Sequence, residues 1–393
     1  MLDNELPPLG GGMGTANIEL LKQFANIPDF EIDLITSALD GKYENEKFAD
    51  NICIYKVPVW NRNIHHSSNR ELIVYSLLSL LKSIQLQRTK KYDFCFAWST
   101  LPAGAVALTL YQLKRLPYMV WVSGPDIPGF EQRYENIYPL LLPLIKKVWL
   151  NAAPLIAKCL EEKEMITSID HSLKVIVIPN GADISGFKPQ ESKSNQRLLK
   201  LICVARLIER KGQHHLIQAL AKLKSEGIDV TVDLVGTGDS LAGYQALTQK
   251  LDLQDRVNFA GYIPRQEIWQ WYQRADIFVL PSYNEGMSLA ALEAMSCGLP
   301  LLLTRTGGTA DLVEDGVNGF TFDWGDVNAI VELVSHLNNN IFLLKMMGKA
   351  SRLRAENYAW PSIAKRYYEL FSASTEGINS PRHAVGYSSQ QLD

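Results

Sequence analysis

The sequence predicts an α/β protein made of two doubly wound domains, each built on a parallel sheet. Short apolar runs of strand length alternate with longer amphipathic stretches along almost the whole chain, which is typical of βαβ units. These runs form two successive sets, one in each half of the chain. A turn and a polar stretch separate the two sets, which indicates two sheets and not one.

The composition is that of an ordinary globular protein. The chain has 393 residues, of which 47% are apolar and 21% are charged, and domains of roughly 100 to 200 residues would make it two or three domains long. The formal net charge of -3 gives no basic field for nucleic acid, which is therefore not an expected partner. The five cysteines are scattered singly, which predicts reduced thiols and no zinc site. Without a secretory signal or an apolar run long enough to span a membrane, we expect a cytoplasmic protein.

The first domain is expected to contain five strands with helices between them, at residues 31–36, 51–57, 92–98, 118–122 and 175–178. Residues 137–157 are strongly apolar, but three prolines and the pair Lys146 and Lys147 interrupt them. Two interpretations stay open for this segment. It is either a core helix or an interfacial helix at the inner face of the cell membrane, because lysine beside Trp149 is also typical of a peripheral anchor.

The second domain is expected to contain strands at residues 198–205, 230–235, 257–260, 277–280 and 299–304. We place the boundary after the turn at Pro179, Asn180 and Gly181, near Gln190, so that the domains are residues 1–190 and 191–374. Residues 375–393 are rich in Gly, Ser and Gln and have little apolar content, which predicts a disordered tail.

Candidate ligand-binding residues follow the strands of the second domain, because ligands bind outside the carboxyl ends of strands in an open parallel sheet. Arg206 directly follows the run 198–205, and Lys211 comes shortly before a helix. The unpaired N–H groups at a helix N-terminus carry about half a positive charge and bind anions. Two cations beside such a terminus predict a phosphate or diphosphate ligand.

Two carboxylates follow the run 277–280, in the stretch PSYNEGMSLAALEAMSCGLP. Glu285 and Gly286 precede a helix that we expect to start near Ser288, and Glu293 lies within that helix. Glu293 follows Glu285 by eight positions, which corresponds to about two helical turns, so the two carboxylates lie on one side of the helix. We expect them to contact different parts of one ligand.

A third element follows the run 299–304, where Gly307 and Gly308 precede another helix. Each element alone has a purely structural explanation, because a basic pair is usually a solvated face and a glycine pair is usually a turn. Their occurrence at successive strand ends predicts a ligand site.

These residues resemble glycosyltransferase family 4, a group of retaining enzymes with the GT-B fold, in which two Rossmann-like domains face each other across a cleft. The similarity extends from Asp3 to about Leu370, and its most specific part is the spacing of Glu285 and Glu293. The resemblance implies an acceptor-binding first domain and a donor-binding second domain. We also expect the last helix to pack back on the first domain.

The resemblance implies a role for each candidate residue of the second domain. Arg206 and Lys211 would bind the donor diphosphate, Glu285 would contact the donor sugar, and Glu293 would bind the ribose hydroxyls. Further donor contacts are implied for two groups of residues, namely Gly286, Met287 and Ser288 through their backbone N–H groups, and the loops that carry Gly236, Gly238, Gly261 and Tyr262.

The first domain carries a glycine-rich stretch, LGGGMGT at residues 9–15, before a helix predicted at residues 16–25. It resembles the family loop that faces the diphosphate across the cleft, so Gly11 and Gly12 are candidate contacts. The family usually has a complete strand before this loop, whereas only residues 1–4 remain of it here.

A second departure follows the run 118–122, where many family members carry a histidine near the donor sugar. This chain has Ser123, Gly124, Pro125 and Asp126 at that place. Asp126 is a candidate for an acceptor or sugar contact, and a cap on the next turn is the alternative.

We therefore expect a transferase that moves a sugar from a UDP- or GDP-sugar to a glycan or lipid-linked glycan, with the retention of configuration that the resemblance implies. No Asp-x-Asp stretch lies near these loops, so no metal or other cofactor is expected. A non-catalytic relative that binds sugar nucleotides is an alternative, motivated by the short first strand and the missing histidine. A Rossmann dehydrogenase is less favoured, because no strand precedes a Gly-x-Gly-x-x-Gly run and the nearest approach, at Gly236 and Gly238, lacks the third glycine.

Overall fold

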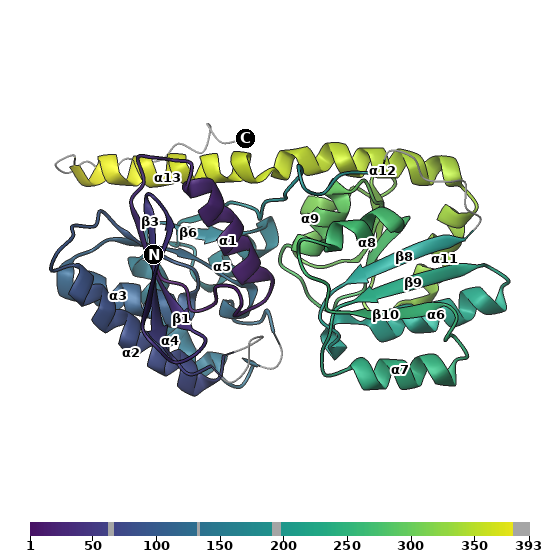
Figure 1. The fold of residues 1–393 in the computed structure, drawn as a ribbon, viewed down its shortest axis with the longest axis horizontal. Coiled ribbons are helices and arrows are strands. Elements are labelled where there is room, and N and C mark those ends of the chain that lie inside the picture. The colour runs from purple at the N-terminus through teal and green to yellow at the C-terminus, as the bar shows by residue number, and fades with distance from the viewer. Residues whose placement is uncertain (62–66, 132–133, 191–197, 380–393) are drawn as a thin grey trace.

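The computed structural model describes residues 1–61, 67–131, 134–190 and 198–379, except for the side chains of residues 375–379. Two α/β parts lie side by side along the longest axis, and helices at the end of the chain run along one side of both (Figure 1). We call the part built on the first sheet the first domain and the other part the second domain.

Leu2 joins two groups of strands in the first domain. One group has the order β1-β3-β2, with β1 (Ile32–Ala38) parallel to β3 (Ile52–Pro58) and antiparallel β2 (Glu44–Ala49) at the edge. The other group is parallel and consists, in order, of β4 (Cys95–Ala97), β5 (Tyr118–Trp121), β6 (Leu155–Ala157) and β7 (Val175–Val177). Leu2 forms parallel bridges to Ile35 and Ala97. The segment at Leu2 therefore lies between the two groups.

Helices cover both faces of this sheet. One face packs against α2 (Asn69–Leu86), α3 (Ala105–Lys114), α4 (Tyr138–Asn151) and α5 (Leu160–Ile169), with short turns at Thr100–Gly104 and Gly124–Asp126. The other face packs against α1 (Gly12–Phe24) and α13 (Trp360–Asn379). The predicted start of the first helix at residue 16 is wrong, because α1 begins at Gly12 and includes part of the glycine-rich stretch.

Helix α4 is a core helix of the first domain, as one of the two interpretations of residues 137–157 predicts. Tyr138, Ile145, Val148 and Trp149 are buried in the domain core. The indole Nε1 of Trp149 donates a hydrogen bond to the Thr100 hydroxyl at 2.8 Å, so this tryptophan is no membrane anchor. The end of the segment differs from a helix, because residues 155–157 form the buried strand β6.

The second domain has a parallel sheet with the order β10-β9-β8-β11-β12-β13. Its strands are β8 (Leu199–Val204), β9 (Val230–Val235), β10 (Val257–Gly261), β11 (Ile277–Leu280), β12 (Leu301–Thr304) and β13 (Gly319–Phe322). Its helices are α6 (Gln213–Ser225), α7 (Leu241–Lys250), α8 (Ile268–Arg274), α9 (Leu289–Ser296), α10 (Thr309–Leu312), α11 (Val327–Asn338) and α12 (Ile341–Ala355). All strands except β13 coincide with the predicted runs, with small differences at their ends.

Helix α13 leaves the second domain after the turn Glu356–Tyr358 and packs on the first domain. Its buried residues recur every three or four positions, which is the spacing of one helix face: Trp360, Ile363, Tyr367 and Phe371. The helix continues to Asn379, so the prediction of disorder from residue 375 is wrong for its first five residues. Residues 380–393 of the predicted tail lie outside the described residues.

Asp3 makes folding sensitive to pH. Its carboxylate is fully buried and accepts hydrogen bonds from Asn17 Nδ2 at 2.8 Å and from the Glu5 N–H at 3.0 Å. Burial raises the pKa of Asp3 to about 8 and outweighs these two hydrogen bonds. The folded state thus holds this proton at a pH at which the unfolded chain, with an ordinary carboxyl pKa of about 3.9, has lost it.

We predict that the free energy of unfolding falls by up to about 1.4 kcal/mol per pH unit between about pH 4 and pH 8 because of Asp3. The Asp3→Asn variant carries no such proton and should show a flatter pH dependence over that range. Urea unfolding followed by tryptophan fluorescence measures both proteins. Parallel pH curves for the two proteins would contradict the assignment.

Candidate functional site

Three predicted elements meet at the carboxyl ends of β8, β11 and β12. Lys211 follows β8 and forms an ion pair with Glu285, which follows β11. Gly308, which follows β12, packs so closely on the Gly286 carbonyl that a side-chain carbon at Gly308 would overlap it. A pocket at this point is lined by residues of the second and third elements, among them Glu285, Gly286, Ser288, Thr304 and Gly308. The structure thus brings together the loops that the sequence indicates.

Local geometry holds Lys211 over the end of β11. Residues Glu209–Lys211 form a single turn, and Gly212 follows with a φ of 69° before α6 begins. A Cβ atom at Gly212 would collide with the Pro281 carbonyl oxygen, so both the backbone conformation and the close contact require glycine. This turn brings the Lys211 ammonium to the carboxylate of Glu285, on the loop that follows the neighbouring strand β11.

Glu285 stays ionised although it is largely buried. Burial alone would raise the pKa of this carboxyl, but the Lys211 ammonium, its hydrogen bond and the charge of Arg210 hold the pKa below its ordinary value. A neutralised lysine–carboxylate pair beside two glycine loops can accept a further anion, because the ammonium has three donors and Glu285 uses only part of them. This arrangement fits a diphosphate next to a sugar.

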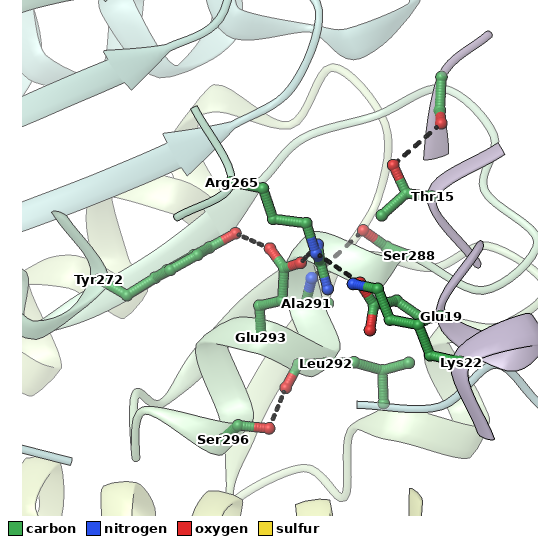
Figure 2. A network of polar contacts seen from close by, with 11 residues as sticks. Thr15, Glu19, Lys22, Arg265, Tyr272, Ser288, Ala291, Leu292, Glu293 and Ser296 are labelled. Atoms are coloured by element: carbon green, nitrogen blue, oxygen red, sulfur yellow. Dashed lines mark hydrogen bonds and ion pairs between the residues drawn. The ribbon is translucent and has the colours of Figure 1, made fainter. Parts of the chain in front are cut away.

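Glu293 lies in a cluster of polar side chains with Arg265 and Tyr272 (Figure 2). One carboxylate oxygen forms an ion pair with the Arg265 guanidinium, and the other accepts a hydrogen bond from the Tyr272 hydroxyl at 2.9 Å. Burial raises the pKa of Glu293 in spite of these two partners. Glu285 is therefore paired with Lys211, and Glu293 with Arg265. A ligand that contacts both glutamates has to extend from one ion pair to the other.

Arg265 connects this cluster to the first domain. Its Nε lies 3.3 Å from a carboxylate oxygen of Glu19 on α1, and the same oxygen accepts from Lys22 Nζ at 2.9 Å (Figure 2). Sequence reasoning did not identify Arg265, Tyr272 or Glu19. Arg265 follows β10 by four positions, and this place near the carboxyl end of a parallel strand is the sequence signal that indicates it.

Glu5 of the first domain interacts with the charge of Arg206 in the second domain. Arg206 lies at the end of β8, and its positive charge lowers the pKa of Glu5, while burial and the charge of Asp126 raise it and together prevail. The first residue of α1 lies near the start of α9, since a Cβ atom on Gly12 would lie 3.9 Å from Leu289 Cδ1, whereas Gly11 has open space around it. The glycine-rich stretch is thus at the cleft, as the start of a helix.

Asp126 serves as a cap, the alternative that the sequence left open. Its carboxylate accepts hydrogen bonds from the Thr100 N–H at 2.9 Å, from the Ser123 N–H at 3.0 Å and from the Ser123 hydroxyl at 2.8 Å. Burial raises the pKa of Asp126 against these bonds. The side chain therefore holds two loops together, and a direct contact to a sugar stays a prediction.

The loops after β9 and β10 show packing reasons for their glycines. A Cβ atom on Gly236 would collide with the Ala205 carbonyl, and one on Gly238 with the Leu207 carbonyl. Gly261 has a φ of 71° and open space beside it, and Tyr262 is 72% exposed. Of the residues predicted here, Gly261 and Tyr262 are the ones on an open surface.

The segment after Gly286 is fixed by backbone contacts. The Met287 carbonyl accepts a hydrogen bond from Asn180 Nδ2 at 3.0 Å, which ties the loop to the turn that leaves the first domain. Ser288 caps α9, and its hydroxyl accepts from the Ala291 N–H at 3.3 Å. Within the described parts of the chain, no three His, Cys, Asp or Glu side chains lie close enough to hold a metal ion.

The sequence is similar to those of known glycosyltransferases. Residues 185–354 match the family model described as glycosyl transferases group 1. Over 215 residues, 51% of this chain, the sequence is 32% identical to a GDP-mannose-dependent alpha-(1-6)-phosphatidylinositol monomannoside mannosyltransferase of Mycolicibacterium smegmatis, of which 56% is covered. It is 25% identical to a D-inositol 3-phosphate glycosyltransferase of Paenarthrobacter aurescens over 90% of both chains.

Solved structures show the same fold. A sucrose-phosphate synthase from Thermosynechococcus elongatus superposes with a TM-score of 0.81 at 20% identity and covers 95% of this chain and 98% of its own. Anabaena HepE in complex with UDP-glucose has a TM-score of 0.74 at 21% identity, with the same coverage.

We predict that Arg265→Ala lowers the free energy of unfolding by about 3 kcal/mol near neutral pH, because it leaves Glu293 buried without a cation. Glu19→Gln removes the ion pair of Arg265 with the first domain and the ion pair with Lys22, leaves the pair of Arg265 and Glu293 in place, and should cost about 1 kcal/mol or less. The penalty of Arg265→Ala should be smaller near pH 5 than near pH 8, since Glu293 takes up a proton more easily at low pH. Urea unfolding of the wild type and the variants at pH 5 and pH 8 measures these differences in the free energy of unfolding.

Arg305→Ala is the matched control, because it breaks an ion pair with Asp323 in which both side chains are exposed. Equal penalties for the Arg265 and Arg305 variants would show that Glu293 does not depend on Arg265.

Proposed function

We propose that this chain, which has the GT-B fold and matches the glycosyl transferases group 1 family model over residues 185–354, transfers a sugar from a nucleoside diphosphate sugar to a glycan or lipid-linked acceptor, with retention of configuration. The observation that carries this proposal is the meeting of Lys211, Glu285 and the Gly286 and Gly308 loops at adjacent strand ends. A buried cation beside backbone N–H groups suits a diphosphate that bears a sugar.

Charge supplies the mechanism in this proposal. When the bond between the sugar and the diphosphate breaks, the electron pair of that bond stays on the leaving oxygen, and the negative charge of the leaving group grows. Preorganised donors that face this charge stabilise the transition state most in a site from which water is excluded. Lys211 is 14% exposed and suits this task, and Arg206 at the end of the same strand would bind the diphosphate with it.

For the nucleotide base of the donor we propose two alternatives, and for the acceptor only a chemical class. The Mycolicibacterium smegmatis relative is named for GDP-mannose, and the Anabaena neighbour binds UDP-glucose. We propose a UDP- or GDP-sugar as donor, with the ribose at Glu293 and the sugar at Glu285. We further propose that transfer needs no metal ion. Arg206 and Lys211 would supply the positive charge that a bound metal ion would otherwise supply.

A non-catalytic relative that binds sugar nucleotides is the second candidate, and the cap role of Asp126 favours it. Release of UDP or GDP from the donor separates the two candidates. An enzyme of this kind releases the nucleotide slowly without acceptor and faster with it, whereas a binding protein only shows thermal stabilisation by the donor.

We predict that Lys211→Ala lowers kcat by about 100-fold or more, because it removes a contact that strengthens as the leaving diphosphate forms. The Lys250→Ala variant removes an exposed lysine of α7 in the same domain and is the control. Both are measured by nucleotide release, with and without EDTA. A near-normal kcat for Lys211→Ala would remove this lysine from the site, and loss of wild-type activity in EDTA would contradict metal-independent transfer.

We predict that Glu293→Gln raises the donor KM by about 10- to 150-fold with little change in kcat, because the ribose is remote from the bond that breaks and one charged hydrogen bond is worth roughly 1.5 to 3 kcal/mol. The amide has one acceptor oxygen where the carboxylate has two. A donor that lacks a ribose hydroxyl serves as control, since the variant should lose the preference for the hydroxylated donor. Unchanged discrimination between the two donors would place the ribose elsewhere.

A further inference from the structure

Trp324 packs against both loops that carry the ion pair of Lys211 and Glu285. It lies in the loop between β13 and α11. A Cβ atom on Gly212, the residue after Lys211, would lie 2.7 Å from Trp324 Cζ3, so the indole lies against the backbone of that glycine. The indole also meets the ring of Tyr283, two positions before Glu285, edge to face with 5.4 Å between the ring centroids. One side chain thus contacts the turn of the lysine and the loop of the glutamate.

The turn at Lys211 depends on its neighbours for its shape. Glycine has the widest backbone freedom of all residues, so the residue type alone does not hold Gly212 at its φ of 69°. The Pro281 carbonyl and the Trp324 indole both lie against Gly212 and restrict it. A backbone hydrogen bond from the Tyr283 N–H to the Arg210 carbonyl, at 2.7 Å, joins the two loops as well. The indole is the one side chain among these contacts, so a substitution can remove it.

Helix α6 holds Trp324 in turn. The indole meets the His215 ring edge to face, with 4.7 Å between the ring centroids. Burial lowers the pKa of His215, so its ring is neutral near neutral pH and brings no second cation to the ion pair. The indole is still 37% exposed, so much of its surface does not serve the hydrophobic core. Its contacts point to a role at the two loops.

We propose that Trp324 is a positioning residue, which holds the Lys211 turn in place and acts on the transfer reaction through Lys211. The inference rests on the proposed function, in which Lys211 stabilises the charge of the leaving diphosphate. A cation stabilises that charge best when it is already in place before the bond breaks. A misplacement of about 1 Å can cost about 100-fold in rate. Loss of the indole would free the turn and separate the ammonium from its place in the site.

Crystal structures of the wild type and the Trp324→Ala variant test the geometric part of the proposal without an activity assay. We expect the ion pair of Lys211 and Glu285 in the wild type and a distance beyond the ion-pair limit of about 4 Å in the variant. Trp324→Phe keeps a ring beside Gly212 and should keep the pair. An intact pair in Trp324→Ala would overturn the proposal.

A double-mutant cycle tests whether Trp324 acts through Lys211. With UDP-glucose and GDP-mannose as donors, Trp324→Ala should lower kcat of nucleotide release about tenfold and change the donor KM less than about threefold, and Trp324→Phe should recover most of this loss. In the Lys211→Ala background, Trp324→Ala should lower kcat less than about twofold, because the residue through which it acts is gone. An equal fold-change in both backgrounds would show that Trp324 does not act through Lys211.

Phe320→Ala is the matched control. Phe320 lies on β13 of the same domain, and its ring meets the His336 ring of α11 edge to face at 6.1 Å. This variant should keep both the ion pair and kcat. Circular dichroism confirms that each variant is folded. If Trp324→Ala unfolds, Trp324→Leu replaces it in both experiments, because leucine keeps apolar volume and lacks the ring.

Failure of the proposed function is a separate result. A wild type that releases nucleotide from neither donor contradicts the proposed transfer, and the crystal structures then decide alone whether Trp324 places Lys211. A wild type that releases nucleotide, with the same kcat after Trp324→Ala, contradicts the role of Trp324 and leaves the proposed transfer in place.

Discussion

Two buried carboxylates in the second domain each require a cation, and the candidate site is organised around that requirement. A carboxylate that is removed from water costs several kcal/mol unless an opposite charge and hydrogen bonds replace its hydration. Lys211 meets this need for Glu285, and Arg265 with Tyr272 meets it for Glu293. The pair of Lys211 and Glu285 connects the loop after β8 to the loop after β11. The pair of Arg265 and Glu293 connects the loop after β10 to α9.

The same charges connect the two domains. Arg265 reaches Glu19 on α1, and Asn180 holds the Met287 carbonyl from the turn that leaves the first domain. Asn284 Nδ2 donates to the Phe130 carbonyl at 2.6 Å, and Gly286 has no room for a side chain because Glu162 of α5 lies against it. A ligand at Glu293 that displaces Arg265 would therefore also act on a contact between domains. Donor binding and the relative position of the domains are coupled through these few side chains in our account.

Much of the fold could be predicted from the sequence, because buried parallel strands are short apolar runs with a regular spacing. The run 230–235 coincides with β9 and the run 277–280 with β11. The missed strands lack this signal. All residues of β2 are exposed or half-buried, β6 follows an apolar helix, and β13 begins with a glycine and has half-buried residues at its centre.

The candidate site was predictable only as far as strand ends define it. Lys211 and Glu285 meet because their strands are neighbours, which topology implies. The pairing of Arg265 with Glu19 depends on how two domains face each other, and no local pattern contains that information. Whether Asp126 caps a turn or contacts a sugar depends on loop conformation, which the residue type leaves open.

A crystal structure of the protein with a bound nucleoside diphosphate sugar tests the central claim most directly. The account predicts the diphosphate within hydrogen-bonding distance of Lys211 and Arg206, the sugar at Glu285, and the ribose hydroxyls on Glu293 in place of the Arg265 guanidinium. A donor bound elsewhere, or one whose ribose leaves the pair of Glu293 and Arg265 intact, would contradict it.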